Sequence, residues 1–430
     1  MPHRTYKKRK IETHDLKPET QMMSYGYDPK LSEGSVKPPI FLTSTFVFDS
    51  PEDGEEFFHV MAGRKAAPDD SVGGLIYSRF NHPNVEIIED RLALWEKCDT
   101  SVICSSGMGA ISSVMMSYLR PGDVIAYSAP LYGGTETLIQ KFLPEYNVKS
   151  HAFAEGLNEE TIYNELKAAT EKGRLAMVFI ETPANPTNTL IDFQALNNAA
   201  DRIEKETGHR PLTVCDNTLM GPVFQQAVPH GIDLSVYSLT KYVGGHSDLV
   251  AGAVCGNKDV MRPVRAMRGA LGLNLDPHTS WMIARSLETV QIRMERAADT
   301  GRKVAQWIAD NPYIKANVLH PDFIEDAAYQ ATYKRQCSGP GSTFAFVVDA
   351  PKATMFKVIN GLSIFKSAVS LGGNESLVCH PASTTHSGVA KDQRDKVGVT
   401  DGLVRLSIGL EHPDDLIADL DNAFKKVFKS

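Results

Sequence analysis

The chain has 430 residues, of which 42% are hydrophobic and 23% are charged, and its formal net charge is -7. This length can bury a substantial core and predicts two or three domains. A mildly acidic chain argues against an extended nucleic-acid surface, and no apolar run approaches the ~20 residues of a membrane-spanning helix. We therefore expect a soluble protein that binds neither nucleic acid nor membrane.

The N-terminal stretch "HRTYKKRK" (3–10) is basic, and we expect a solvated or subunit-crossing arm rather than a nucleic-acid tail. No apolar segment of a secretory signal follows it, which favours a cytoplasmic location. The prolines and β-rich residues of "KPPIFLTSTFVFDS" (37–50) predict an extended segment. The polar residues 49–74 predict a surface excursion.

Short apolar runs then alternate with helical patterns. Strands are predicted through Cys104 and Tyr127 and over 175–180, 212–215 and 250–255, and helices over 109–119, 159–170 and 193–205. Such alternation predicts an α/β fold with a mostly parallel, doubly wound sheet and helices on both faces.

A long helical stretch over 278–308 marks a boundary in the pattern. The runs "GSTFAFVVDA" and "DGLVRLSIGLE" and an amphipathic terminal helix follow it, and together they predict a smaller α+β domain. The apolar face of that helix consists of Leu416, Ile417, Leu420, Phe424 and Val427. The predicted division is an arm and extended segment (1–75), an α/β domain (76–286) and a C-terminal α+β domain (287–430).

The six cysteines lack the close spacing of a zinc or redox motif, so we expect no metal and no disulfide framework. Ligands in open α/β sheets bind where strands end, which directs attention to the residues that follow apolar runs.

Three polar stretches follow such runs. The turn Ser105–Ala110 ("SSGMGA") opens a predicted helix, where free N–H groups favour a phosphate, although a structural turn is equally compatible. Asp216 ends the run "LTVCD" and is a candidate buried carboxylate or, alternatively, a cap or turn residue. Asn185 stands between prolines, which is common turn chemistry.

A fourth stretch, "SVYSLTKYVGGHSD" (235–248), places Lys241 among small hydroxyl and glycine neighbours. A surface lysine is the commoner interpretation of the residue alone. A phosphate-binding turn, a strand-end aspartate and a strand-end lysine together match the needs of pyridoxal 5'-phosphate (PLP), which requires donors for its phosphate, a carboxylate for its pyridinium nitrogen and an amine.

The chain resembles the trans-sulfuration, or Cys/Met-metabolism, family of PLP-dependent enzymes, which includes methionine γ-lyases, cystathionine γ-synthases and O-acylhomoserine sulfhydrylases. The resemblance runs from about residue 38 to the C-terminus. It rests on motifs in the family's order, among them "PPIFLTSTFVF", "YSRFNHPN", "SSGMGAISS", "PLYGGTETL", "ETPANPTN", "CDNT", "SLTKYVGGHSD", "SLGGNESLVCHPASTTHS" and "VRLSIGLE". It implies the aspartate-aminotransferase-like (type I) fold, with a large doubly wound mixed-sheet domain and a smaller C-terminal α+β domain.

The resemblance implies a role for each matching residue. Lys241 would form the Schiff base with the cofactor and then move protons on the substrate. Tyr132 would stack on the cofactor ring and assist proton transfer at the leaving group. Asp216 would pair with the pyridinium nitrogen, and Asn185 would contact the phenolic oxygen and the substrate.

The phosphate would be held by four residues of this subunit, Gly107, Met108, Ser238 and Thr240. Arg405, with Ser370, would bind the α-carboxylate of an amino-acid substrate. Tyr77 and Arg79 would reach the phosphate of the neighbouring subunit, which implies at least a dimer and, as is usual in the family, a homotetramer. The stretch 49–74 is longer than the corresponding segment of the family. It is either a change at the active-site entrance or dimer contact, or a neutral surface insertion.

The exact reaction stays open between γ-elimination and γ-replacement on an acylated homoserine. Val369 stands where cystathionine-handling members commonly have a glutamate, and with "HPASTTH" it favours methionine γ-lyase or a sulfhydrylase. Gly134, where methionine γ-lyases typically have cysteine, favours the synthases and sulfhydrylases. Of the two reactions, γ-elimination from a sulfur amino acid is the one we expect. For His246 we expect a structural hydrogen bond rather than a catalytic role.

Overall fold

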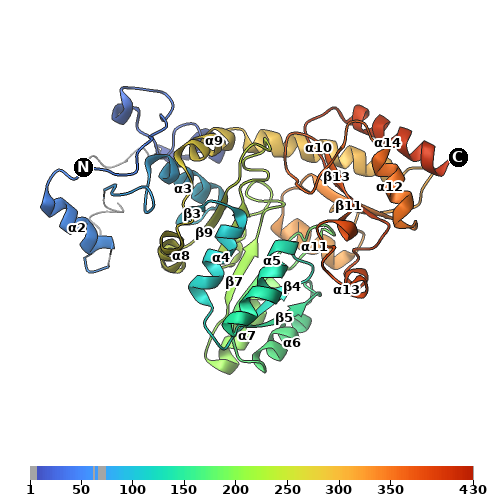
Figure 1. The fold of residues 1–430 in the computed structure, drawn as a ribbon, viewed down its shortest axis with the longest axis horizontal. Coiled ribbons are helices and arrows are strands. Elements are labelled where there is room, and N and C mark those ends of the chain that lie inside the picture. Colours follow the sequence, from blue (N-terminus) through green and yellow to red (C-terminus); the bar gives the residue numbers. More distant parts are fainter. Residues whose placement is uncertain (1–6, 62, 66–73, 430) are drawn as a thin grey trace.

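The computed structural model describes residues 7–61, 63–65 and 74–429. The two larger β-sheets lie side by side along the long axis, with the N-terminal segment at one end and the C-terminal helix at the other (Figure 1). Within the described residues, no helix has the length and apolar character needed to cross a membrane.

The larger sheet has the strand order β3-β9-β8-β7-β6-β4-β5. Its strands are β3 (Thr100–Cys104), β4 (Asp123–Ser128), β5 (Lys149–Phe153), β6 (Arg174–Glu181), β7 (Leu212–Asp216), β8 (Leu234–Ser238) and β9 (Gly252–Gly256). Pairing is parallel from β5 through β4, β6 and β7 to β8, whereas β9 runs antiparallel to both β8 and β3. This confirms the predicted mixed, doubly wound α/β sheet.

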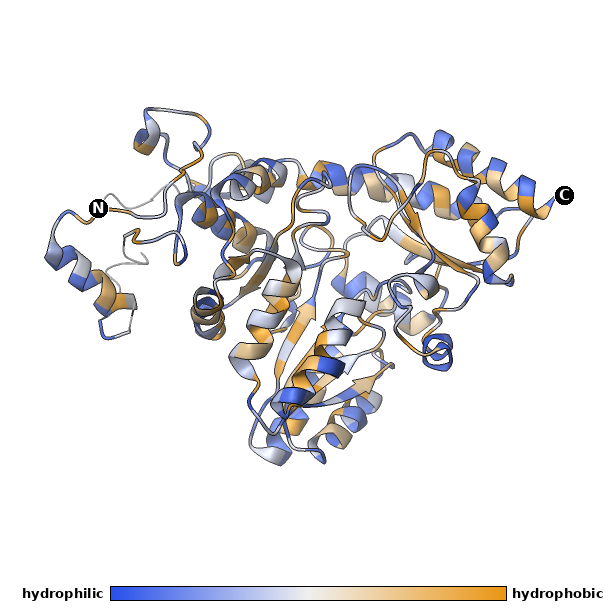
Figure 2. Ribbon diagram, viewed as in Figure 1, coloured by the Kyte–Doolittle hydropathy of each residue, from blue (hydrophilic) through white to orange (hydrophobic). Residues whose placement is uncertain are grey.

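Helices cover both faces of this sheet because its strands are apolar on both sides (Figure 2). On β4, Ile125 packs in the core with α4 (Gly107–Tyr118), whereas its neighbour Val124 packs with α6 (Glu159–Thr170) and α7 (Phe193–Thr207). Successive strand residues point to opposite faces, so one apolar run serves two cores. The other helices of this part are α3 (Pro83–Glu96), α5 (Gly133–Thr137) and α8 (Lys258–Leu271).

The smaller sheet has the order β10-β11-β14-β13-β12 and forms the C-terminal α+β part. Its strands are β10 (Ala316–Leu319), β11 (Thr343–Val348), β12 (Lys366–Ser367), β13 (Leu377–Cys379) and β14 (Leu403–Ser407). Its core is shared with α10 (Val290–Ala309), α12 (Lys352–Asn360) and α14 (Pro413–Phe428). On α14, Leu416, Leu420 and Phe424 are fully buried, as the amphipathic pattern predicted.

The helix predicted over 278–308 is in fact two helices, α9 (Pro277–Leu287) and α10. The backbone leaves helical geometry at Thr289 (φ -121°). The buried Arg293 guanidinium lies at this break, where its Nη2 donates to the carbonyl oxygen of Ser286 (2.9 Å), which also accepts the Thr289 N–H (3.2 Å).

The predicted surface excursion begins with a helix, α2 (Pro51–Met61), which projects away from the body of the chain (Figure 1). Its acidic residues leave no long apolar stripe, so the sequence pattern did not indicate it. Residues 62 and 66–73 of the excursion and residues 1–6 of the basic arm lie outside the described residues. Near the arm's end, Lys7 forms an ion pair with Asp90 (2.8 Å). Other short elements are β1 (Lys10–Ile11), β2 (His14–Asp15), α1 (Pro18–Gln21) and α13 (Lys391–Lys396).

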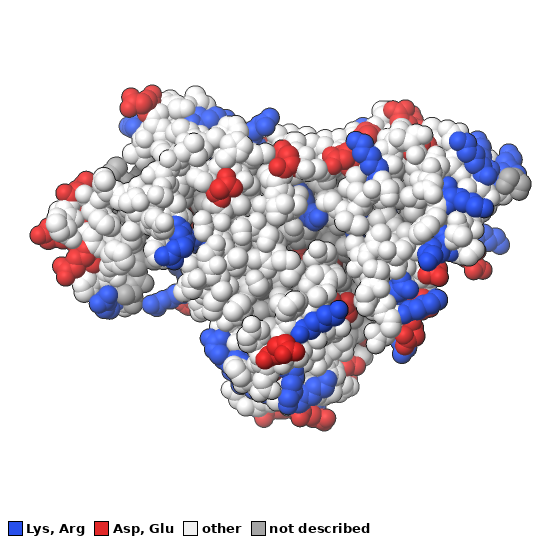
Figure 3. Space-filling view, viewed as in Figure 1, with Lys and Arg blue, Asp and Glu red and all other residues white. Residues whose placement is uncertain are grey.

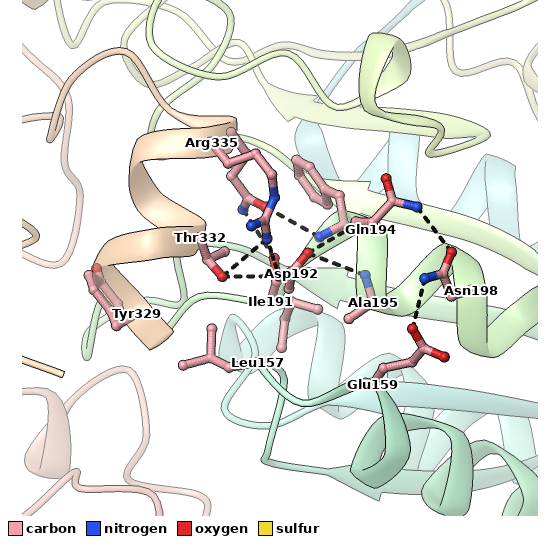
Figure 4. A network of polar contacts seen from close by, with 12 residues as sticks. Leu157, Glu159, Ile191, Asp192, Gln194, Ala195, Asn198, Tyr329, Thr332 and Arg335 are labelled. Atoms are coloured by element: carbon pink, nitrogen blue, oxygen red, sulfur yellow. Dashed lines mark hydrogen bonds and ion pairs between the residues drawn. The ribbon is translucent and has the colours of Figure 1, made fainter. Parts of the chain in front are cut away.

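One polar network joins α7 of the larger sheet to α11 (Ala327–Gln336), which connects β10 to β11 (Figure 4). Asp192 precedes α7, and its Oδ1 accepts the N–H groups of Gln194 (2.9 Å) and Ala195 (3.2 Å). Its Oδ2 accepts the Thr332 hydroxyl (3.0 Å) and pairs with Arg335 on α11. The same carboxylate therefore caps one helix and holds another against it.

Candidate active site

The carboxyl ends of three neighbouring parallel strands bring the predicted residues together. Glu181 at the end of β6 is the register partner of Asp216 at the end of β7, and Asp216 is the partner of Val236 on β8. The loop after β6 carries Asn185, and the turn after β8 carries Lys241. The sheet thus places an amide, a carboxylate and an amine at one edge.

Lys241 lies at the junction of the two sheets. Its Nζ donates to Ser370 Oγ at 2.9 Å, and Ser370 belongs to the C-terminal part of the chain. Burial, aided by the nearby positive charge of Arg405 and opposed by Asp216, lowers the pKa of Lys241 to about 8. An amine with this pKa is neutral, and so nucleophilic, in a much larger fraction of molecules near neutral pH than a free lysine is.

Asp216 is buried, with 8% of its surface exposed. Its Oδ1 accepts both the N–H (3.1 Å) and the hydroxyl (2.6 Å) of Thr218. Burial raises the pKa of Asp216, and the charge of Lys241 lowers it only in part. A buried carboxylate of this kind is stabilised by an additional cation, which a protonated ring nitrogen would supply.

The predicted phosphate turn opens α4. Ser106 caps the helix by accepting the Gly109 N–H (2.9 Å), and the N–H groups of the first residues, Gly107 and Met108, have no intrahelical acceptor. A Cβ at position 107 would lie 2.9 Å from Ser238 Cβ, so only glycine allows β8 to end this close to the helix. The turn and Ser238 therefore form one cradle.

The structure gives Thr240 a different set of contacts. Its hydroxyl accepts the Ala251 N–H (3.1 Å) and donates to the Ala251 carbonyl oxygen (3.2 Å). These bonds hold the turn after β8 against the segment that enters β9. A role of Thr240 in phosphate binding stays a prediction.

Tyr132 and Asn185 stand on two different loops that meet at Glu181. Tyr132, 45% exposed, donates its N–H to Glu181 Oε2 (2.7 Å), and Asn185 donates its N–H to Glu181 Oε1 (2.9 Å). A Cβ at Gly134 would lie 2.6 Å from Cε1 of the Tyr132 ring, so the ring can occupy its position because residue 134 is a glycine.

Arg405 is 1% exposed and reaches the site from β14. Its Nη1 donates to Asn185 Oδ1 (3.0 Å), and its Nη2 donates to the carbonyl oxygens of Val369 (2.9 Å) and Ser370 (2.8 Å). Its Nε is buried and, among the described residues, finds no acceptor. This fixed guanidinium next to Lys241 is suited to a carboxylate ligand.

Tyr77 and Arg79 lie on the segment that precedes α3. Tyr77 pairs with Thr45 in an isolated antiparallel β-bridge. The Nη1 of Arg79 donates to the Gly269 carbonyl oxygen (2.9 Å). None of the hydrogen bonds between described residues joins either side chain to Lys241 or Ser238. Their contact with the phosphate of a neighbouring subunit stays a prediction. His246 makes the expected structural contact, with Nδ1 at 2.6 Å from the Gly244 carbonyl oxygen.

Glu181 is the site residue that the sequence did not indicate. It is 3% exposed, and it is the last residue of the run "LAMVFIE", just before "TP". A carboxylate that ends an apolar run is a usable signal, and the same signal had identified Asp216. In the part of the chain that the structure describes, no group of three or more His, Cys, Asp or Glu side chains could hold a metal ion.

The charged side chains on the face shown in Figure 3 are of both signs and interspersed, mostly toward the periphery. One surface hollow, about 450 Å³, lies away from the strand ends and is lined by residues such as Asn197, Arg210 and Arg335. Its arginines are already paired with aspartates. The chemistry of the chain is therefore concentrated at the strand ends around Lys241.

Comparison with known proteins agrees with this geometry. The model of the family described as "Cys/Met metabolism PLP-dependent enzyme" matches residues 19–425. An L-methionine gamma-lyase of Fusobacterium nucleatum subsp. polymorphum is 35% identical over 92% of this chain and 94% of its own length. One of Pseudomonas deceptionensis is 36% identical over 94% and 96%.

Among solved structures, a cystathionine gamma synthase of Xanthomonas oryzae pv. oryzae, in complex with aminoacrylate and cysteine, superposes with a TM-score of 0.84. It is 30% identical, and the match covers 96% of this chain and 98% of that one. A buried acid without a full counter-charge, a glycine-built cradle and an amine of lowered pKa all fit the cofactor that this family is named for.

Proposed function

The chain belongs to the Cys/Met metabolism family of PLP-dependent enzymes, and from this premise we propose that it catalyses γ-elimination from methionine or a homocysteine-like amino acid. The products would be a thiol, an α-keto acid and ammonia. The cofactor is pyridoxal phosphate. We further propose that the protein acts in the cytoplasm as a homotetramer of active dimers, in which Tyr77 and Arg79 contact the cofactor phosphate of the neighbouring subunit.

One observation carries the choice of substrate. Val369 supplies a carbonyl oxygen to Arg405 and therefore lies beside the proposed carboxylate site, and the residue is 57% exposed. An apolar side chain there offers no partner for a distal ammonium group, since such a group needs a carboxylate. An uncharged thioether fits this position better than cystathionine does.

The residues of the chain would divide the work. When bound, pyridoxal phosphate supplies an aldehyde for an amine and a protonated ring that withdraws electrons from the substrate's α-carbon. Arg405 would hold the α-carboxylate, with Ser370 beside it. Lys241, as a neutral amine, would take the proton from the α-carbon and release it to the cofactor. Neutral again, it would then take a proton from the β-carbon. Tyr132 would deliver a proton to the departing sulfur.

Asp216 would keep the ring nitrogen protonated by pairing with it, and Asn185 would contact the phenolic oxygen. Gly107, Met108, Ser238 and Thr240 would hold the phosphate with N–H and hydroxyl donors. These positions follow from the family motifs and from the common strand-end location of their side chains.

The second candidate is γ-replacement on O-acetyl- or O-succinyl-homoserine. Gly134 favours it, because the residue beside the Tyr132 ring is a glycine, as in synthases and sulfhydrylases. The relatives named methionine γ-lyase are more similar to this chain, at 35% and 36% identity, than the superposed cystathionine γ-synthase, at 30%. This difference supports elimination as the first choice.

The deciding experiment is product analysis of the holoenzyme. The enzyme is incubated with L-methionine, L-cystathionine and both acyl-homoserines, with and without cysteine or sulfide. Elimination predicts 2-oxobutanoate and methanethiol from methionine without added thiol. If methionine is inert while an acyl-homoserine plus a thiol gives a thioether or homocysteine, the second candidate replaces the first.

A further inference from the structure

Glu181 lies at the centre of the site without being one of its predicted residues. It ends β6, is 3% exposed, and is the register partner of Asp216 on β7. Its own N–H donates to Ser128 Oγ at the end of β4 (3.0 Å). The backbone of Glu181 is thus fixed by both neighbouring strands, and its side chain extends beyond the sheet edge.

The two carboxylate oxygens of Glu181 bind two different loops. Oε2 accepts the N–H of Tyr132, which follows β4, and Oε1 accepts the N–H of Asn185, which follows β6. The distances, 2.7 and 2.9 Å, lie in the normal range for N–H···O hydrogen bonds. A single ionised carboxylate can accept both, whereas a neutral amide has only one acceptor oxygen.

These two loops carry the side chains that would enclose the cofactor and orient the substrate. Tyr132 presents the ring proposed to stack on the cofactor. Asn185 Oδ1 accepts Arg405 Nη1 at 3.0 Å, which links the loop to the proposed carboxylate-binding residue. Because Glu181 holds the backbone at Tyr132 and at Asn185, it sets the separation of both side chains.

The charge around Glu181 is unbalanced in the absence of a cation. Burial and the negative charge of Asp216, with a smaller effect of Glu136 on α5, raise the pKa of Glu181 to about 8, and the two N–H donors oppose this rise only in part. Lys241 acts on the pair through its attraction to Asp216. A protonated ring nitrogen at Asp216 would neutralise the carboxylate that repels Glu181.

We propose that Glu181 is a positioning residue of the cofactor site, whose carboxylate holds the Tyr132 and Asn185 loops together and is favoured in its ionised form when the cofactor ring pairs with Asp216. The inference rests on the proposed cofactor site and not on which γ-substituent leaves. Its test therefore measures cofactor binding, so that its outcome and that of the product analysis are independent.

The test is titration of apoenzyme with pyridoxal phosphate, followed by absorbance, from about pH 6 to about pH 9. Glu181→Gln is expected to raise the cofactor Kd about tenfold or more, because one buried N–H loses its acceptor. In the wild-type apoenzyme, Glu181 carries a proton below about pH 8 and releases it when the cofactor binds. The affinity for the cofactor should therefore rise with pH up to about 8. This contribution to the pH dependence of the cofactor Kd is absent in Glu181→Gln, whereas the contribution of Lys241 is present in both proteins.

The matched control is Glu96→Gln. Glu96 is fully buried and accepts the N–H groups of Ala227 (2.7 Å) and Val228 (3.0 Å) as well as the Tyr237 hydroxyl, away from both loops. It should lower the melting temperature at least as much as Glu181→Gln does while leaving the cofactor Kd and its pH dependence unchanged. Equal effects of the two substitutions on the Kd, or a wild-type pH dependence in Glu181→Gln, would overturn the proposal.

Glu181→Asp provides a second variant should the amide fail to fold. Aspartate keeps the negative charge, but its side chain is shorter by one methylene, so its carboxylate can reach only one of the two N–H groups. The proposal expects a weakened Kd with the wild-type pH dependence preserved. A wild-type Kd in Glu181→Asp would show that the two loops do not depend on this carboxylate.

Discussion

The Nζ of Lys241 lies 2.9 Å from the Oγ of Ser370, so the amine that follows β8 is in direct contact with the C-terminal part of the chain. The neighbour of that hydroxyl, Val369, and Ser370 itself both give their carbonyl oxygens to Arg405. The amine and the guanidinium are therefore held close to each other by one short segment, and the two positive charges interact.

This arrangement predicts how cofactor loading depends on pH. The pKa of Lys241 is lowered to about 8, so about one-tenth of the amines are neutral at pH 7, against fewer than about one in a thousand for a free lysine. We expect the rate at which apoenzyme and pyridoxal phosphate combine to rise with pH up to about 8 and then level off. Stopped-flow absorbance measures this rate. A rate that climbs steadily to pH 10 would contradict the lowered pKa.

Arg405→Lys tests the substrate site separately from the cofactor site. Lysine keeps the positive charge near Lys241 but cannot present the planar fork that the present contacts hold in place. The KM for the amino acid should rise about ten- to a hundredfold, the equivalent of one or two charge-assisted hydrogen bonds, with the cofactor absorbance unchanged. Arg302→Lys, at a site 48% exposed, is the control and should change neither the KM nor the cofactor absorbance. Early loss of cofactor from Arg405→Lys would contradict the assigned role.

Gly134→Ala tests whether the position of the Tyr132 ring matters. The added Cβ would lie 2.6 Å from Cε1 of the ring and 3.2 Å from Met108 Sδ, so the ring must move. Because misplacement of a reacting group by about 1 Å can cost about a hundredfold, we expect kcat to fall at least tenfold while the cofactor stays bound. Gly388→Ala, where an added Cβ meets nothing within 4 Å, is the matched control. Equal kcat values for the two variants would remove Tyr132 from the proton-transfer role.

Local pattern was sufficient for much of the fold and for part of the site. The helix over 159–170 has the bounds that the sequence predicted, because its apolar spacing and the Asn158 cap are local features. Asp216 and Lys241 were identified because one ends an apolar strand and the other lies shortly after one. Parallel pairing then brings such strand ends together.

The features that the sequence did not predict depend on distant contacts. Glu181 becomes a two-loop anchor only because β4 and β6 are neighbours in the sheet. The break between α9 and α10 lies beside Arg293, whose guanidinium also donates to the carbonyl oxygen of Tyr242, far away in the chain. Thr240 stands in a motif typical of phosphate binding, yet its hydroxyl is bonded to Ala251. Apart from the position of Glu181 at the end of an apolar run, these pairings leave no local trace in the sequence.

The junction of α7 and α11 predicts a stability effect that can be divided in two (Figure 4). Asp192→Ala removes both the cap of α7 and the contacts with Thr332 and Arg335, and should cost about 1–3 kcal/mol. Asp192→Asn keeps an oxygen for the cap but turns an N–H₂ group toward Arg335, so it should lose only the contact between helices. Because Arg335 is 47% exposed, solvent screens that loss, which should be about 1 kcal/mol or less.

Thermal unfolding of the apoprotein measures both variants, since neither touches the cofactor site. Asp201→Ala is the control: its carboxylate pairs with Arg210 but is 53% exposed, so its loss should be within about 0.5 kcal/mol of zero. The expected order of melting temperatures is Asp201→Ala, then Asp192→Asn, then Asp192→Ala as the lowest. If Asp192→Asn unfolds at the temperature of Asp192→Ala, the contact with α11 rather than the helix cap stabilises this junction, because the cap survives in one variant and not in the other.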